Sequence, residues 1–267
     1  MNPITLSAIC LSIIFLSTTL GGALVYFFRK NFSKKTGAII IGLASGIMIA
    51  TSFFGLLLPS IEEGTLLYGE KMAAIPVTVG FLLGGLLLYI LDKVVPHFHR
   101  SGNEEEGIKT TRVTKQTKFI LAVTLHNIPE GIAVGLVCGM AFNATGNIEA
   151  TYFSALSLAL GIAIQNFPEG AAVSIPMLEE ENVSKTKAFF LATLTGVVEP
   201  LFGLLTILLA TYLNGALPYL LSFAAGAMIY VTIDELIPEF KEEGKGHFGL
   251  WSFMIGFLIM MLLEILI

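Results

Sequence analysis

The sequence contains little charge. Asp, Glu, Lys and Arg make up only 13% of its 267 residues, whereas a soluble domain averages about 25%. Hydrophobic residues account for 55% of the chain. A protein with so few charged side chains cannot cover a water-exposed surface in the usual way. The composition therefore indicates an integral membrane protein rather than a soluble enzyme or binding module.

Other chemistries are also missing. The only two cysteines, Cys10 and Cys138, lie in apolar runs, which is typical of small buried side chains and not of a disulfide framework or a thiolate metal site. No basic patch interleaved with aromatic residues is present, so nucleic acid is excluded as a partner. The HExxH motif of zinc hydrolases is absent as well.

Long hydrophobic runs, by contrast, dominate the chain. A membrane-spanning helix needs about 20 predominantly apolar residues, and eight stretches satisfy this length. We therefore predict an all-α integral membrane protein, with residues 1–267 forming a single transmembrane domain of eight helices in contact with lipid. The predicted spans are 4–28, 37–59, 73–95, 118–141, 151–177, 187–212, 215–238 and 248–267.

The distribution of lysine and arginine predicts the orientation of these spans. Fourteen of the 15 basic residues lie in the loops that follow spans 1, 3, 5 and 7, and only Lys71 lies on the other side. Basic loops face the cytoplasm, so both termini are expected on the extracytoplasmic side of the cytoplasmic membrane. An even number of spans requires the two termini to share a side, which agrees with the span count.

The longest predicted loop, residues 96–117, lies on the cytoplasmic side. It is polar and charged, as expected for a segment without a packed core. His97 and His99 in this loop have two interpretations. They capture metal at the cytoplasmic face, or they are ordinary solvated side chains of a variable loop.

Two distant segments resemble each other. Residues 44–64, "ASGIMIATSFFGLLLPSIEEG", match residues 224–244, "AAGAMIYVTIDELIPEFKEEG", and the following spans align Val79 with Ile255. The first segment runs outward and the second inward, so the repeat is inverted. We predict that spans 1–3 and 6–8 are related in this way around a central helix pair, an arrangement typical of secondary transporters.

Two short motifs place polar groups inside predicted spans. "HNIPEG" occupies 126–131 and "QNFPEG" occupies 165–170, 39 residues later. Residues four apart share one face of a helix, and residues three apart lie close to the same face. The third carboxylate is that of Glu199, in the span that begins at 187. The side chains brought to one face by each motif are His126, Asn127 and Glu130, and Gln165, Asn166 and Glu169.

These polar groups share one depth. At 1.5 Å per residue, Glu130, Glu169, Glu199 and Met48 all lie about 15–20 Å from the cytoplasmic side of a core about 30 Å thick. A carboxylate there costs about 2.5–3.5 kcal/mol. No lysine or arginine lies at that depth, so internal salt bridges cannot offset the cost. A divalent cation offsets it, and oxygens, one imidazole and a thioether suit zinc.

With these motifs the chain resembles the ZIP family of divalent-metal transporters, most closely its GufA-like branch. The resemblance covers essentially the whole chain and implies a binuclear centre. It implies that His126, Glu130, Gln165, Glu169 and Glu199 form one site, with Met48 beside it. Asn127 and Asn166 share the glutamates in the second site, where some members carry aspartate at the position of Asn166. Asp234 and Glu235 correspond to the inner release path, although many members carry histidine at the position of Asp234.

The resemblance also implies a function and a mechanism. Zinc, or cadmium, iron or manganese, would pass from outside to the cytosol, and spans 1, 4, 5 and 6 would slide against spans 2, 3, 7 and 8 in a homodimer. Two alternatives stay open at this stage. One is a proton- or cation-coupled carrier of another solute, and the other is an intramembrane zinc hydrolase, which the single deep histidine disfavours.

Overall fold

The computed structural model describes residues 2–27, 33–95, 97–98, 105–106, 115–143, 148–179, 183–210, 212, 214–243 and 247–266. Within these ranges, eight helical segments are long and apolar enough to cross a membrane. The predicted all-α, eight-span membrane architecture is therefore confirmed. The described strands are two-residue segments within the 96–117 loop, β1 (His97–Phe98) and β2 (Glu105–Glu106), which pair antiparallel.

Several spans are built from more than one helical element. The first four spans are formed by α1 (Pro3–Ala23) with η1 (Leu24–Tyr26), by α2 (Lys34–Ala50), η2 (Thr51–Leu57) and α3 (Leu58–Tyr68), by α4 (Ala74–Val94), and by α5 (Lys115–Asn143). The last four are formed by α6 (Ile148–Ser174) with η3 (Pro176–Glu179), by α7 (Lys185–Gly196) and α8 (Val198–Ala210), by η4 (Asn214–Ala216), α9 (Leu217–Val231), η5 (Thr232–Leu236) and α10 (Ile237–Glu243), and by α11 (Phe248–Leu266).

Polar side chains cap the N-terminal starts of three spans. The side chain of Asn2 accepts a hydrogen bond from the Thr5 backbone N–H, and Ser33 and Ser184 cap α2 and α7 in the same manner. The caps satisfy amide groups that have no partner inside a helix. They fix where each apolar stretch becomes helical, close to the starts expected from the sequence.

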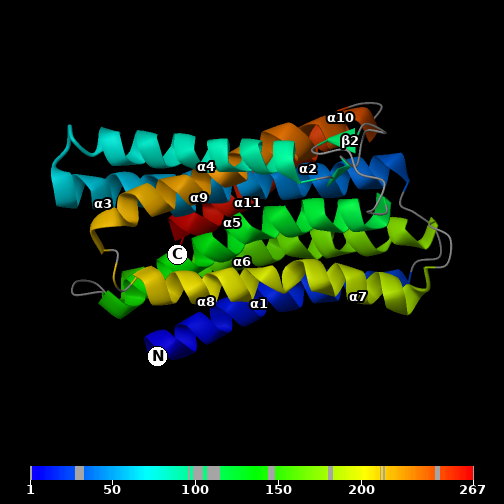
Figure 1. Ribbon diagram of the computed structural model, residues 1–267, viewed down its shortest axis with the longest axis horizontal. Helices are drawn as coiled ribbons and strands as arrows, with labels where there is room; N and C mark the ends of the chain where they lie inside the picture. The colour runs from blue at the N-terminus through cyan, green and yellow to red at the C-terminus, as the bar shows by residue number, and fades with distance from the viewer. Residues whose placement is uncertain are drawn as a thin grey trace.

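The helices pack into two sets that lie side by side (Figure 1). In one set, α1 packs along α6 and α5 packs along α8, with α7 against α1. In the other, α2 packs along α11 and α4 packs along α9. The sets meet where α2 contacts α6 and where α5 contacts α9. The central pair, α5 and α6, therefore lies at the boundary between the two sets.

Glycines allow the paired helices to approach at backbone distance. A Cβ on any of several glycines would overlap a backbone oxygen of the neighbouring helix, so only glycine permits this spacing. The contacts are Gly21 with Phe167 and Gly170 with Thr18 between α1 and α6, Gly46 with Phe253 and Gly256 with Leu43 between α2 and α11, and Gly84 with Phe223 and Gly226 with Phe81 between α4 and α9.

Three spans depart from regular α-helix near mid-length. Span 2 is π-helical over Thr51–Leu57 and span 7 over Thr232–Leu236. Span 6 is interrupted at Val197, so that Glu199 stands in the first turn of α8. By contrast, α5 and α6 continue through Pro129 and Pro168. Such irregularities often occur at functional sites because they redirect side chains.

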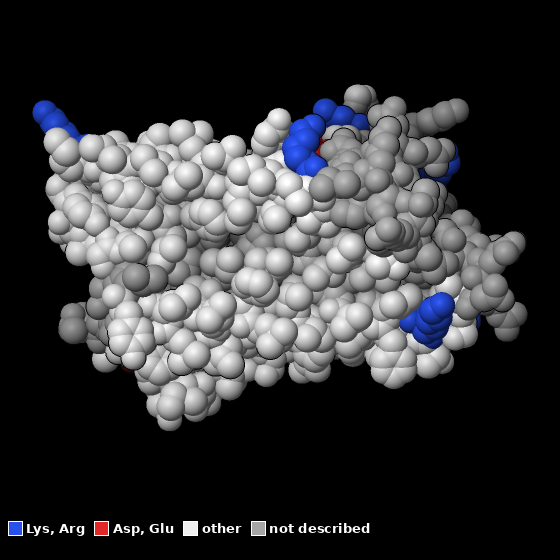
Figure 2. Space-filling view, viewed as in Figure 1, with Lys and Arg blue, Asp and Glu red and all other residues white. Residues whose placement is uncertain are grey.

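On the face of the bundle shown in Figure 2, the exposed basic side chains lie at the two ends. Figure 2 shows Lys and Arg at the end that carries α10 and the start of α7, a middle that is almost free of charge, and basic atoms at the opposite end, where α3 meets α4. Lys71 occupies the turn between α3 and α4. Both chain ends point toward this opposite end (Figure 1). The uncharged middle agrees with a multi-pass membrane protein.

Candidate metal centre

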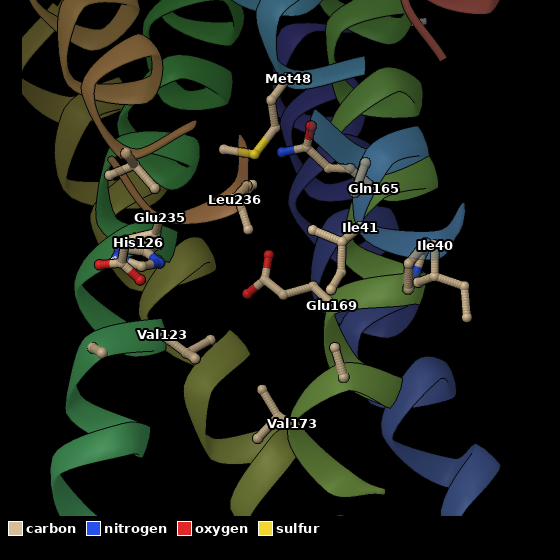
Figure 3. Close-up of a pocket in the computed structure, with 15 residues that line it drawn as sticks. Ile40, Ile41, Met48, Val123, His126, Gln165, Glu169, Val173, Glu235 and Leu236 are labelled. Atoms are coloured by element: carbon tan, nitrogen blue, oxygen red, sulfur yellow. Dashed lines mark hydrogen bonds and ion pairs between the residues drawn. The ribbon is translucent and has the colours of Figure 1, made fainter. Parts of the chain in front are cut away.

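A cavity of about 70 Å³ lies at the boundary between the two helix sets. Its polar lining comes from four spans: Met48 from α2, His126 from α5, Gln165 and Glu169 from α6, and Glu235 from η5. The rest of the lining is apolar. Figure 3 shows the sulfur, imidazole, amide and carboxylate groups surrounding one common space rather than pointing outward to lipid.

His126 and Glu235 are in contact at one side of the cavity. The Nε2 of His126 lies 2.8 Å from Glu235 Oε1, and the two side chains are only 11% and 13% exposed. Glu235 lies in the π-helical segment of span 7, and such segments frequently occur at functional sites. The pair joins the two helix sets, since α5 belongs to one and η5 to the other.

Side chains on α2 and α6 offer oxygen and sulfur atoms that could bind a metal ion. Gln165 donates its amide N–H to Glu130 Oε1 at 2.7 Å, which turns the amide oxygen of Gln165 away from Glu130. That oxygen and Glu169 Oε1 are buried and have no hydrogen-bond partner among the described residues. The Met48 side chain is buried, and its sulfur accepts a hydrogen bond from Thr232 at 3.8 Å.

Behind the cavity lies a second polar group centred on Glu199. Both carboxylate oxygens accept hydrogen bonds: Oε1 from Asn127 Nδ2 and Thr18 Oγ1, each at 3.0 Å, and Oε2 from Asn166 Nδ2 at 2.9 Å. Asn127, Asn166 and Glu199 are fully buried and do not line the cavity. The break before α8 places the Glu199 carboxylate at a helix N-terminus, which favours negative charge.

The unpaired atoms in this region are all oxygens. Buried polar atoms without partners are rare, and each one calls for a physical explanation such as a role in binding an ion. An acceptor oxygen on a carboxylate or an amide is what a cation needs. The unpaired atoms in and behind the cavity are Asn127 Oδ1, Glu130 Oε2, Gln165 Oε1, Asn166 Oδ1 and Glu169 Oε1.

In this conformation the histidine and carboxylate side chains do not converge on one point. Among the described residues, no three His, Cys, Asp or Glu side chains converge closely enough to form a metal group. His126 is held by Glu235, while the Glu169 carboxylate points into the open cavity from α6 (Figure 3). Rotation of Glu169 toward His126 would complete a set with imidazole, carboxylate, amide oxygen and thioether, which suits a d-block dication.

The other predicted site residues lie in different places, and only one of them lines the cavity. Glu235, expected on the release path, lines the cavity itself. Its neighbour Asp234 is exposed and is not part of the lining. His97 lies in β1, where only the backbone is described, and His99 lies outside the described residues.

Sequence reasoning missed Thr18. This threonine donates to Glu199 from α1, 181 positions away in the chain. A buried hydroxyl in an apolar run is a weak signal, since serine and threonine in membrane helices commonly bond to their own backbone. Thr18 also lies near Ile14 O, at 3.4 Å. The contact with Glu199 could only be found once α1 was known to pack in this set of helices.

Comparison with known proteins decides the family. A model of the family described as "ZIP Zinc transporter" matches residues 103–264. The chain belongs to the ZIP family. Its similarity to a relative described as "Zinc transporter GufA" places it with the GufA-like members. It is thus a member of a transporter family and not of an enzyme family.

Curated relatives cover nearly the whole ZIP chain. It is 35% identical over 248 residues to "Zinc transporter GufA" of Myxococcus xanthus, with 91% of this chain and 92% of the relative aligned. It is 32% identical over 319 residues to "Zinc transporter ZIP11" of Xenopus tropicalis, with 93% of both chains aligned. "Zinc transporter ZIPB" of Bordetella bronchiseptica is 36% identical, with 94% and 77% aligned.

Proposed function

We propose that this ZIP protein carries zinc across the cytoplasmic membrane into the cytosol, with cadmium, iron and manganese as further candidate substrates. The observation that carries the proposal is the cavity between the two helix sets, lined by Met48, His126, Gln165, Glu169 and Glu235. The alignments with two relatives described as zinc transporters cover more than nine-tenths of this chain. This similarity supports zinc as the transported ion.

Charge balance supports a divalent cargo. Glu130, Glu169 and Glu199 lie inside membrane-spanning helices, where three carboxylates cost on the order of 8–10 kcal/mol on the lenient insertion scale. Among the residues that the structure describes, no Lys or Arg lines the cavity. A dication that binds there gains attraction from the carboxylates and removes their repulsion. A neutral solute would leave this cost uncompensated.

A second ion site fits behind the first. Glu130 links the two polar groups, because Gln165 donates to its Oε1 while its Oε2 has no partner. The unpaired amide oxygens of Asn127 and Asn166 provide further neutral ligands. We place the second metal of a binuclear centre among these atoms and Glu199. The amide at position 166 lowers the negative charge of this site, so it binds its ion more weakly than the first.

The cavity lies toward the lysine-bearing end of the bundle. The cavity extends from Met48 along α2 to Ile40 and Ile41, and α2 begins at Lys34 on the lysine-bearing end of the bundle. Basic ends face the cytoplasm. The conformation therefore exposes the metal centre toward the cytoplasmic half, as expected of a transporter at the release stage of its cycle.

Helix contacts support the inverted repeat. The α2–α11 contacts of Gly46 and Gly256 have counterparts in the α4–α9 contacts of Gly226 and Gly84. These glycines are 180 residues apart in spans 2 and 7, which is the offset of the sequence alignment, and 172 apart in spans 3 and 8. The alignment of Val79 with Ile255 has an offset of 176, so we propose a register one helical turn away for spans 3 and 8.

Zinc uptake into proteoliposomes tests the function. Liposomes that contain the wild-type chain are expected to accumulate zinc, with no substrate chemically changed. The Glu130→Ala and Glu169→Ala variants are expected to fold but to lose zinc uptake. Glu149→Ala is the matched control, because Glu149 is an exposed acid in the first turn of the same helix as Glu169. Undiminished zinc flux in both the Glu130→Ala and the Glu169→Ala variants would refute the site. Transport of another solute, independent of zinc, would favour the alternative carrier.

A further inference from the structure

The Met48 sulfur is held by a residue that does not itself line the cavity. The hydroxyl of Thr232, the first residue of η5, donates a hydrogen bond to Met48 Sδ at 3.8 Å. Thr232 is 0% exposed and does not belong to the cavity lining. The contact joins span 7 to span 2. Any effect of Thr232 on a metal ion in the cavity must therefore act through Met48.

The Thr232 hydroxyl can direct its hydrogen toward the sulfur. Its other acceptor is the carbonyl oxygen of Met228, four residues earlier in the same span, at 2.8 Å. A hydroxyl has only one hydrogen to donate. The Met228 carbonyl oxygen also accepts the backbone N–H of Thr232, so this oxygen does not depend on the hydroxyl. Donation to Met48 Sδ therefore leaves no buried acceptor without a partner.

A methionine side chain benefits from such a contact when its sulfur acts as a metal ligand. Methionine is unbranched, has three rotatable bonds and adapts to many conformations. It belongs to the side chains that lose the most rotamer freedom when they become ordered. The hydrogen bond from Thr232 restrains the Met48 sulfur before a metal ion arrives. Less freedom is then lost when the metal binds, and the affinity is higher.

The contact with Thr232 leaves the sulfur able to bind a metal ion. A thioether sulfur carries two lone pairs, and a single hydrogen bond uses one of them. Figure 3 shows the Met48 sulfur beside Gln165 at one end of the cavity. Met48 lines the cavity and Thr232 does not, so the hydroxyl does not occupy the space that a metal ion would take. Thr232 thus holds the ligand without competing for its site.

The alignment of span 2 with span 7 distinguishes Thr232 from its counterpart. It pairs Met48 with Met228 and Ser52 with Thr232. Each hydroxyl donates to the methionine carbonyl four residues earlier, Ser52 at 2.7 Å and Thr232 at 2.8 Å, as serine and threonine commonly do in helices. Thr232 in addition reaches a sulfur, and that sulfur belongs to the methionine that lines the cavity. Local helix geometry alone does not explain this additional contact.

A restrained thioether matters most for soft dications. Sulfur ligands favour soft metals, whereas carboxylate and amide oxygens suit harder ones. Among the residues that the structure describes, Met48 provides the one sulfur atom of the cavity lining, and His126, Gln165 and Glu169 provide nitrogen and oxygen. Cadmium is softer than zinc and gains more from a sulfur ligand. Restraint of the Met48 sulfur therefore raises the affinity for cadmium more than the affinity for zinc.

We propose that Thr232 is a positioning residue, which holds the Met48 sulfur at the metal centre and thereby sets how strongly the centre binds cadmium relative to zinc. The inference rests on the proposed metal transport, because it concerns the same cavity. Thr232 itself contacts no metal. Loss of its hydroxyl releases the sulfur and removes no atom from the cavity lining.

The test is equilibrium binding of cadmium and of zinc to the purified full chain in detergent, measured by titration calorimetry. Thr232→Val keeps the shape of the side chain and removes the hydroxyl. This variant is expected to raise the Kd for cadmium about fivefold, which corresponds to about 1 kcal/mol of binding free energy. The Kd for zinc should rise less than about twofold, because zinc is less soft. Thr232→Ser keeps the hydroxyl and should restore most of the cadmium affinity.

A double-mutant cycle tests whether the effect passes through the sulfur. Met48→Leu replaces the thioether with an apolar side chain of similar volume. In the Met48→Leu protein, the further change Thr232→Val should leave the ratio of the cadmium Kd to the zinc Kd unaltered. Thr206→Val is the matched control, because the Thr206 hydroxyl bonds within its own helix, to Phe202 O. Both Kd values should keep their wild-type size in this control.

The outcomes separate this inference from the proposed function. An unchanged cadmium Kd in Thr232→Val would overturn the positioning role and leave the transport function intact. An equal rise of both Kd values, without rescue by Thr232→Ser, would also overturn it, since this pattern reports a general structural defect. Zinc binding without cadmium binding by the wild-type chain would overturn the role of the sulfur. A wild-type chain that binds neither metal would overturn the metal centre itself.

Discussion

At the scale of single residues, the polar side chains divide into a group that lines the cavity and a group held around Glu199 by three hydrogen-bond donors. The family resemblance implied two neighbouring sites and assigned Glu199 to the first. The structure places the Glu199 carboxylate with Asn127 and Asn166, behind the cavity. Spacing within a helix predicts which face a side chain occupies. It does not predict which of several neighbouring helices that face meets.

Thr18 is expected to stabilise the Glu199 carboxylate. Thr18→Val keeps the shape of the side chain and removes the donor to Oε1, so Asn127 alone would serve that oxygen. The loss should lower the free energy of unfolding by about 1–3 kcal/mol, measured as a lower thermal midpoint in detergent. Thr19→Val is the control, because Thr19 bonds only within its own helix, to Phe15 O. Equal midpoints for both variants would contradict the assignment.

Glu235 and Asp234 are adjacent but should differ in function. Glu235→Ala removes the partner of His126 from the cavity and should lower the initial rate of zinc uptake about tenfold, a loss of about 1.4 kcal/mol of transition-state stabilisation. Asp234→Ala changes an exposed residue outside the cavity lining and should retain most of the rate. A larger defect in Asp234→Ala would place the release path elsewhere.

At the scale of helices, the apolar runs predicted the number of spans and their approximate ends. They did not predict the π-helical turns of η2 and η5 or the break at Val197. Hydrophobicity reports length and burial, whereas these irregularities depend on how neighbouring helices fit. Span 2 was also expected to end at residue 59, but α3 continues to Tyr68, beyond the apolar part of the span.

Glycine contacts should control the pairing of α1 with α6. Gly170→Ala places a Cβ onto the backbone oxygen of Thr18, which cannot move aside as a side chain would. The overlap should lower the free energy of unfolding by about 1–3 kcal/mol or more. Gly215→Ala meets nothing within 4 Å and should unfold at the wild-type temperature. A wild-type midpoint for Gly170→Ala would show that the two helices are further apart than described.

At the scale of the whole molecule, two helix sets meet around one polar cavity. The sequence predicted which spans form each set only through the family resemblance, because no local pattern encodes long-range helix pairing. The sets of the structure agree with that division. Relative sliding of the sets and assembly into a homodimer stay predictions, as does the placement of both termini outside the cell.

The orientation can be tested with two exposed lysines at opposite ends of the bundle. Lys71 lies between α3 and α4, and Lys187 lies at the start of α7. In intact cells, Lys71→Cys should react with a membrane-impermeant maleimide, whereas Lys187→Cys should react only after lysis. The native Cys10 and Cys138 are fully buried and provide a low background. The reverse labelling pattern would invert the topology and the direction of transport.

The central claim is that the cavity between the helix sets coordinates a divalent metal. Anomalous diffraction at the zinc edge, from crystals of the full chain grown with zinc, tests it most directly. The account predicts a peak about 2.0–2.2 Å from a ring nitrogen of His126 and from a carboxylate oxygen of Glu169, with Gln165 and Met48 adjacent. A zinc-saturated crystal without density in this cavity would contradict the account.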